Sequence, residues 1–233
     1  MGENRLDPPV ESTAQVVVAK SVEAAASLLP VVGGPLSVVI ATLFGVSYER
    51  RLHEWRDEVT ARIRELNESL GVRIEDLAQD GAFLDALAAA TRIAEMSSSA
   101  EKRAYLANAL YNIGAGSDLS DDKQTIYLRY IEELTASHMV MLEFLGDPPA
   151  FLKRRGIPWP NILMGGLGAV AKVALPELCD DGPLLETVLT DLERLGLVQR
   201  LPGFNTVMTD QGLRTGRGTR KGSEFLAFIT RPI

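Results

Sequence analysis

The chain has 233 residues, 46% of them hydrophobic and 24% charged, enough for one large or two modest folded domains. Its formal net charge of -7 argues against general binding to nucleic acid, because an acidic protein repels the phosphate backbone unless a local basic patch overcomes the repulsion. The single cysteine, Cys179, excludes a disulfide within the chain, and the first residues lack the basic start of a secretory signal. We therefore expect a cytoplasmic protein, with a peripheral position at the inner membrane as the open alternative.

Residues 24–48 carry no charged side chain, which is unusual in a chain of this composition. Pro30 and the Gly33-Gly34-Pro35 cluster interrupt this segment, and the length of the continuous part that follows suits a buried core helix or a shallow hairpin better than a membrane span. Three interpretations stay open: a buried helical hairpin in a core, a conditional or peripheral membrane element, and a constitutive span. The candidate membrane contacts are Leu36, Val38, Val39, Ile40, Leu43 and Phe44.

A helix is expected from Glu11 to about Leu29, and a second helix from near Pro35 to about Leu70. The second half of this helix has an apolar stripe at regular helical spacing, which predicts a long amphipathic helix docked on other helices. Trp55 is expected to be one of its largest buried groups. The stripe consists of Tyr48, Leu52, Trp55, Val59, Ile63, Leu66 and Leu70.

Further helices are predicted from apolar spacing and from the glycines and prolines that end each run. Ser98 and Glu101 have the spacing of a capping box. His138 is expected on an apolar face as a buried core residue, and residues 165–168 are interpreted as close helix packing. The predicted helices lie at about residues 74–79, 81–96, 99–113, 122–145, 161–178 and 183–195.

The sequence after residue 183 has the pattern of a helix followed by a hairpin. Gly196 is expected to end the helix in a left-handed conformation. Leu197 and Val198 should begin a strand, and residues 206–208 should return as the second strand after a turn at Gly203.

The run Leu195-Gly196-Leu197-Val198, together with Thr219, Gly222 and Phe225, resembles the winged-helix domain of bacterial regulators. The resemblance concerns the C-terminal part of the chain, and together with the helices predicted before it, it indicates a mainly α protein. An N-terminal helical bundle with an apolar hairpin, residues 1–120, would precede a winged-helix-like α+β domain, residues 121–233. Winged helices also serve as protein-docking modules, so the fold alone does not assign a function.

Basic side chains in the stretch GLRTGRGTRKG are the candidate contacts to nucleic acid. The helix at 183–195, in the position of a recognition helix, carries a net negative set of polar residues instead of the Arg, Lys, Asn or Gln that usually read the major groove. Nucleic acid is therefore disfavoured as a partner but stays open, and a solvated loop is the alternative interpretation. The candidate contacts are Arg214, Arg217, Arg220 and Lys221.

The runs LLPVVGGPL, EELTASHMVMLEFLGDP and GSEFLAFI resemble the small bacterial abortive-infection proteins of the Abi-alpha type. They are also similar to the four-helix membrane-active domains of cell-death effectors. The resemblance implies a phage-defence or toxin role without enzymatic chemistry.

No phosphate-binding glycine loop, metal-spaced cluster or catalytic constellation is visible, so we expect no enzyme, no cofactor and no metal site. The favoured function is a non-enzymatic bacterial effector or interaction protein with a protein partner or self-association, and membrane activity is an open part of this prediction. The alternative is a winged-helix DNA-binding transcription regulator.

Overall fold

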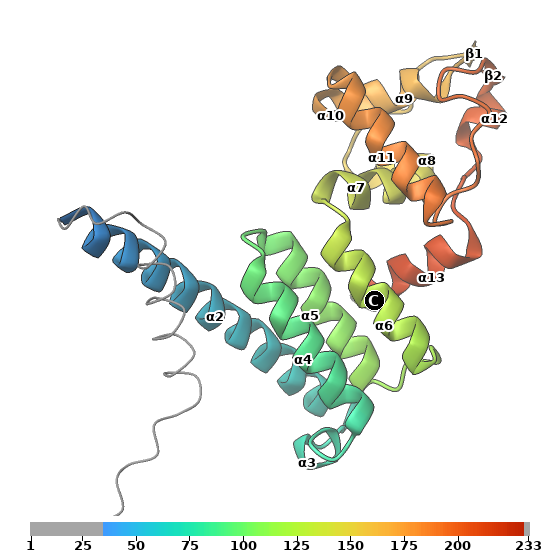
Figure 1. The fold of residues 1–233 in the computed structure, drawn as a ribbon. Helices are drawn as coiled ribbons and strands as arrows, with labels where there is room; N and C mark the ends of the chain where they lie inside the picture. Colours follow the sequence, from blue (N-terminus) through green and yellow to red (C-terminus); the bar gives the residue numbers. More distant parts are fainter. Residues whose placement is uncertain (1–34, 231–233) are drawn as a thin grey trace, which may run out of the picture. The chain divides into compact units, whose positions relative to one another are not determined.

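The computed structural model describes the backbone of residues 35–230 and the side chains of residues 49–230. Within these residues the protein is mainly helical, as predicted, with twelve helices and one sheet of two short strands (Figure 1). The helix expected at 11–29 and the turn of the apolar hairpin lie outside the described residues, so the hairpin stays a prediction.

Helix α2 spans Pro35–Leu70 and begins and ends where the sequence predicted. Gly71 follows it with φ 68°, a left-handed conformation that stops the helix at little cost. Trp55 is 2% exposed and Leu66 is 1% exposed, which confirms that the stripe packs into the core. Leu70 belongs to the predicted apolar stripe but is 54% exposed. It lies at the end of the helix, beyond the surface that packs on the core.

Four helices follow; the first three have bounds close to those expected, and the fourth begins where expected but ends earlier. The cap of α5 is Ser99, whose hydroxyl accepts a hydrogen bond from Lys102 N–H at 3.1 Å. The predicted capping box at Ser98 is therefore wrong by one residue, and Glu101 instead accepts from the Ser99 hydroxyl. The four helices are α3 (Ile74–Leu77), α4 (Gly81–Met96), α5 (Ala100–Gly114) and α6 (Asp121–Glu133).

The helix expected at 122–145 is divided into α6 and α7 (Ala136–Gly146). Leu134 and Thr135 have extended backbones, and the Thr135 N–H donates to Nδ1 of His138 at 3.2 Å. Because a side chain of the third helical residue satisfies the N-cap N–H, a new helix starts there. His138 is 5% exposed, which confirms its predicted burial.

The helix expected at 161–178 is also wrong. Met164 and Gly165 form strand β1, which pairs antiparallel with β2 (Met208–Thr209). Gly166 then caps helix α9, and a Cβ on Gly166 would lie 2.6 Å from the Asn205 backbone. Gly166 is closely packed, as predicted, but against the loop at Asn205 instead of another helix. The helices here are α8 (Pro148–Arg154), α9 (Leu167–Ala174), α10 (Pro176–Asp180) and α11 (Gly182–Arg194).

The C-terminal segment pairs differently from the expected hairpin. Gly196 has φ 68°, as predicted, and Val198 then forms an isolated bridge with Gly218. The expected return strand at 206–208 instead contributes Met208 to the pairing with β1. Helices α12 (Asp210–Arg214) and α13 (Arg220–Ile229) complete the described chain.

Internal contacts divide the chain into two compact units, Met1–Leu52 and His53–Ile233, with the boundary inside α2. Within the second unit α6 packs on α4 and α5, and α13 packs on α5 and α7 (Figure 1). Helices from both sides of residue 120 therefore share one core. The expected domain division between residues 120 and 121 stays a prediction.

Candidate functional site

Arg217, a candidate nucleic-acid contact, holds its own loop together. Its backbone N–H donates to the Leu145 carbonyl at 2.6 Å, and this bond ties the loop to the end of α7. A guanidinium that points inward to backbone carbonyls is not free to meet a phosphate. The side chain donates to Thr215 O at 2.8 Å, Gly212 O at 2.9 Å, Met208 Sδ at 3.2 Å and Gly216 O at 3.5 Å.

Lys221 is half-buried and connects α13 with two other segments. Its ammonium donates to the Leu195 carbonyl at 2.8 Å and to the Tyr130 hydroxyl at 2.6 Å. The same ammonium lies 4.9 Å from the centroid of the Tyr130 ring, within the range of a cation–π contact. This charge stabilises the packing of α13 at the end of α11.

Arg214 lies over the Trp159 ring, with its guanidinium carbon 4.3 Å from the ring centroid. It also donates to Asp210 at 2.7 Å, and Asp210 accepts from the Trp159 indole N–H at 2.8 Å. The hydrogen bonds from Arg214 and Trp159 lower the pKa of Asp210. The three side chains therefore form a closed set across α12 and the segment before β1.

Arg220 is the most exposed of the four candidates, at 91% of its side chain. It donates to Glu224 one helical turn later, at 2.9 Å. Glu224 also accepts from Lys123 on α6, and these two bonds lower the pKa of Glu224 to about 2. The structure brings the four basic residues into one C-terminal region, but three of them face inward or are stacked.

Helix α11, which was expected to take the position of a recognition helix, turns Val188 and Leu192 into the core. Its exposed side chains include Glu186, Thr187 and Thr190. Major-groove readers present donors such as Arg, Asn or Gln at these places. The exposed face of α11 instead presents Glu186 with two threonines, and Arg194 at its end is paired with Glu133 and Asp191.

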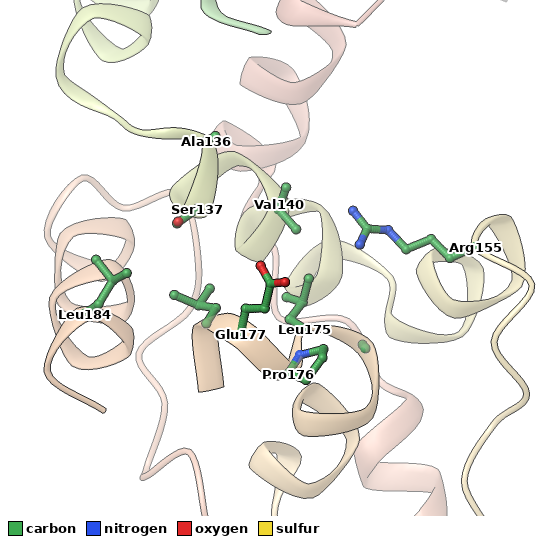
Figure 2. A pocket seen from close by; sticks show the side chains of 10 residues that line it. Ala136, Ser137, Val140, Arg155, Leu175, Pro176, Glu177 and Leu184 are labelled. Atoms are coloured by element: carbon green, nitrogen blue, oxygen red, sulfur yellow. The ribbon is translucent and has the colours of Figure 1, made fainter. Parts of the chain in front are cut away.

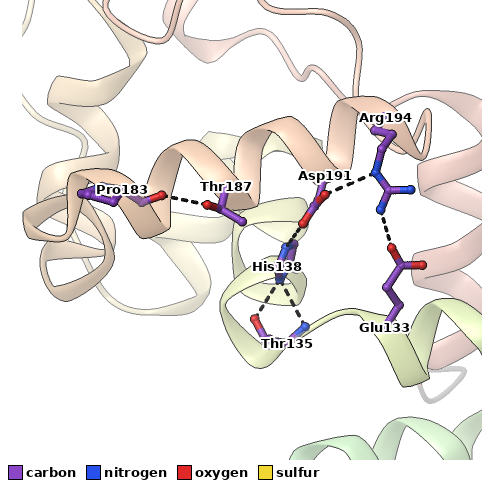
Figure 3. Close-up of polar contacts among 7 residues, drawn as sticks. All are labelled: Glu133, Thr135, His138, Pro183, Thr187, Asp191 and Arg194. Carbon is purple, nitrogen blue, oxygen red and sulfur yellow. Dashed lines mark hydrogen bonds and ion pairs between the residues drawn. The ribbon is translucent and has the colours of Figure 1, made fainter.

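A polar junction joins α7 to α11, and sequence reasoning missed it (Figure 3). His138 Nε2 lies 3.4 Å from Asp191 Oδ2, and Asp191 also accepts from Arg194 at 3.3 Å. Arg194 in turn donates to Glu133 at the end of α6. The junction fixes α11 against the break between α6 and α7. No local sequence signal could reveal it, because His138 and Asp191 are 53 residues apart.

The geometry determines which nitrogen of His138 carries the proton. A backbone N–H can only donate, so Nδ1, facing the Thr135 N–H, must be the unprotonated acceptor. Nε2 then carries the hydrogen that faces Asp191. Burial lowers the pKa of His138, although the hydrogen bond to Asp191 opposes that effect. The neutral imidazole is therefore the form that this junction requires.

A hollow of about 560 Å³ lies between α7, the end of α8, and helices α9, α10 and α11 (Figure 2). Its lining includes the apolar side chains Val140, Leu178 and Leu184 and, with them, Arg155 and Glu177. A volume of this size suits a small molecule or a few side chains of a docked partner. The lining can accept an apolar group with charged groups beside it.

The six candidate membrane contacts, Leu36, Val38, Val39, Ile40, Leu43 and Phe44, fall in the first half of α2. Their backbone is helical, and their side chains lie outside the described residues. In the part of the chain that the structure describes, none of the helices combines the length and apolar character that crossing a bilayer requires. The membrane role of residues 24–48 stays a prediction.

The described residues contain no group of three or more His, Cys, Asp or Glu side chains that could hold a metal ion. Cys179 is partly exposed, and burial raises the pKa of its thiol, which disfavours a reactive thiolate. Comparisons with protein-family models, with curated proteins and with solved structures found no match. Only this chain's own residues therefore carry a functional conclusion.

Proposed function

We propose that this protein is a non-enzymatic effector or interaction protein. Its C-terminal region would be a winged-helix-like module that docks a protein, and the apolar half of α2 would engage a membrane surface. The resemblance to abortive-infection proteins supports a role in bacterial phage defence.

The order of elements supports the winged-helix-like arrangement. Helices α7 and α8 precede β1, helices α9 to α11 follow it, and a loop then returns through β2 to pair with β1. In a winged helix, α11 would be the third helix, and residues 199–217 would form the wing. The bridge between Val198 and Gly218 closes the base of that loop.

The main support for protein docking is that the basic side chains of the C-terminal region are bonded within the fold. Arg217 and Lys221 donate to backbone carbonyls, and Arg214 is paired with Asp210. Phosphate contacts need cations that face solvent, and base contacts need donors on the exposed helix. Arg220 faces solvent but is paired with Glu224, and Arg194 on α11 is paired with Glu133 and Asp191. The hollow beside α11 instead offers apolar contact to a protein.

A DNA-binding regulator is the second candidate, because the order of elements would serve it equally well. A binding selection against random DNA duplexes tests it, and enrichment of a defined site would promote the regulator. Weak binding that falls steeply with salt and is lost in Arg220→Ala would indicate phosphate contact only. Arg220→Ala is the cleaner variant, because Arg217→Ala would also disturb the loop.

The membrane function is tested by flotation of the intact protein with liposomes. Leu36→Asp and Val39→Asp should abolish association, since a charge in the bilayer centre costs about 2.5–3.5 kcal/mol on insertion scales. Thr60→Asp, an exposed position on the same helix, is the matched control and should float like the wild type. If the wild type does not float under any activating condition, the membrane role is wrong and residues 24–48 are a plain core segment.

A further inference from the structure

An ion cluster around a buried arginine lies where α2 packs on α5. Arg103 of α5 is 5% exposed and faces two carboxylates one helical turn apart on α2. Its terminal nitrogen donates to Glu54 at 2.6 Å, but its Nε is 3.7 Å from Glu58. The first contact is a strong charge-assisted hydrogen bond, and the second is an ion pair without a hydrogen bond.

Two atoms of this cluster are buried without hydrogen-bond partners: Nε of Arg103 and Oε2 of Glu58. A buried polar atom left unpaired loses its hydration without a compensating bond, and the loss is larger for charged groups. Burial raises the pKa of Glu58, and Glu54 adds to this effect, while Arg103 and Arg62 oppose it. The ionised carboxylate therefore fits poorly in the closed packing.

The rest of the contact, which we call the α2 seam, joins residues 53–70 to α4 and α5. Trp55 donates to Thr91 at 3.0 Å, and Arg62 donates to Asn108 at 3.1 Å. Trp55 and Leu66 supply the fully buried apolar area. The seam is thus an apolar contact with a carboxylate at its edge, and one oxygen of this carboxylate is buried without a hydrogen-bond partner.

We propose that the incompletely bonded carboxylate of Glu58 keeps the α2 seam close to opening, so that α2 can separate from α4 and α5. In the open state Glu58 regains its hydration, and Trp55 and its apolar neighbours are uncovered. The membrane-contact half of α2 belongs to the same helix, so opening the seam frees the whole helix to engage a lipid surface. Only this last step rests on the proposed function.

The substitution Glu58→Gln tests the seam because it removes the charge and keeps an oxygen that can accept from Arg103. If Glu58 and Arg103 formed a simple stabilising salt bridge, the seam would open more readily in this variant. Our proposal predicts that the seam opens less readily. Glu68→Gln is the matched control, since it makes the same change of charge at an exposed position of α2.

Opening is measured on the full chain in a Trp159→Phe background, where Trp55 is the remaining tryptophan of the two. Acrylamide quenching of Trp55 and hydrogen exchange of residues 53–70 should both fall in Glu58→Gln. The exchange rate should fall by clearly more than it does in Glu68→Gln, because the neutral amide removes the cost of keeping the Glu58 charge in the closed seam. Faster exchange than in the wild type, or a change no larger than in Glu68→Gln, would overturn the proposal.

The pH dependence of quenching gives a second test with a definite sign. A carboxyl whose pKa is raised in the closed state takes up a proton more readily there, so acidification tightens the seam. Trp55 of the wild type should become less accessible as pH falls from 7 toward 5, and Glu58→Gln should lack this change. A wild type that opens on acidification through this range would contradict the proposal.

Flotation with liposomes separates the seam from the membrane function. Weaker flotation of Glu58→Gln, together with its reduced quenching, supports the whole proposal. If the quenching falls but wild type and variant float equally, the link between seam opening and lipid contact is overturned. If the quenching falls and neither protein floats, the proposed membrane function fails and the opening of the seam stands.

Discussion

Arg103 in the α2 seam and Arg217 in the C-terminal loop are both cations drawn into the fold, but they are satisfied differently. Arg217 donates to backbone and sulfur acceptors within its own loop. Arg103 meets two carboxylates and still has an unpaired Nε. The backbone acceptors of Arg217 are fixed by the loop, whereas the carboxylates facing Arg103 are carried by a separate helix.

This difference indicates which part of the molecule is built to hold its shape. Hydrogen bonds from a cation to fixed carbonyls make a loop rigid, because leaving it would strand several acceptors. An ion cluster with unmet groups gains from opening, because water can satisfy those groups. We therefore expect the C-terminal region to stay ordered while α2 exchanges between packed and separated states.

The largest expected effect tests the apolar side of the seam. Trp55→Ala should lower the free energy of unfolding by about 3–5 kcal/mol, the usual cost of removing a buried tryptophan. Trp159→Ala, which removes a half-buried ring from the C-terminal region, should cost clearly less. Chemical denaturation with light scattering measures both. An unchanged midpoint for Trp55→Ala would show that the stripe is a partner-binding face instead of core.

A smaller effect on stability is expected in the C-terminal loop around Arg217. Arg217→Ala should cost about 1–3 kcal/mol, because it removes the hydrogen bonds from the guanidinium to the carbonyls of Thr215 and Gly212. Arg220→Ala removes an exposed charge nearby and should change stability by less than about 0.5 kcal/mol. Thermal melts compare the two variants. Equal melting temperatures would mean that Arg217 is not what orders the loop.

The smallest effect is the pH response of the His138 junction. Since burial lowers the pKa of His138 in the folded state, the unfolded chain takes up this proton first as pH falls below about 6.5. Stability is therefore full above that pH and falls below it, by at most about 1.4 kcal/mol per pH unit for one proton. Melting temperatures measured between pH 7.5 and 5 follow this loss.

His138→Gln should flatten this pH response, because glutamine can still accept from the Thr135 N–H and donate to Asp191 without titrating. His53→Gln is the control, since His53 is exposed on α2. A wild-type slope that persists in His138→Gln would assign the response to other groups, with Asp191, Glu133 and Lys102 the nearest charges.

The sequence by itself determined the elements that depend on local signals. Pro35 and Gly71 bound α2, the apolar spacing placed Trp55 in the core, and Gly196 supplied the left-handed end of α11. These features follow from backbone sterics and from helical periodicity within a few residues. The net acidic character of α11 was also predictable, because it follows from the charged residues of the helix itself.

Only the tertiary structure decided the features whose partners are far apart in the chain. The break at Thr135 uses a local bond to His138, but the junction that holds it needs Asp191, 53 residues later. Strand β1 exists because residues 208–209 pair with it, although Gly165 was interpreted from the sequence as a site of close helix packing. The basic residues looked free in sequence and are bonded in the fold, and Arg103 meets Glu54 across 49 residues. Local propensity carries no record of such contacts, since they form only when separate helices are packed together.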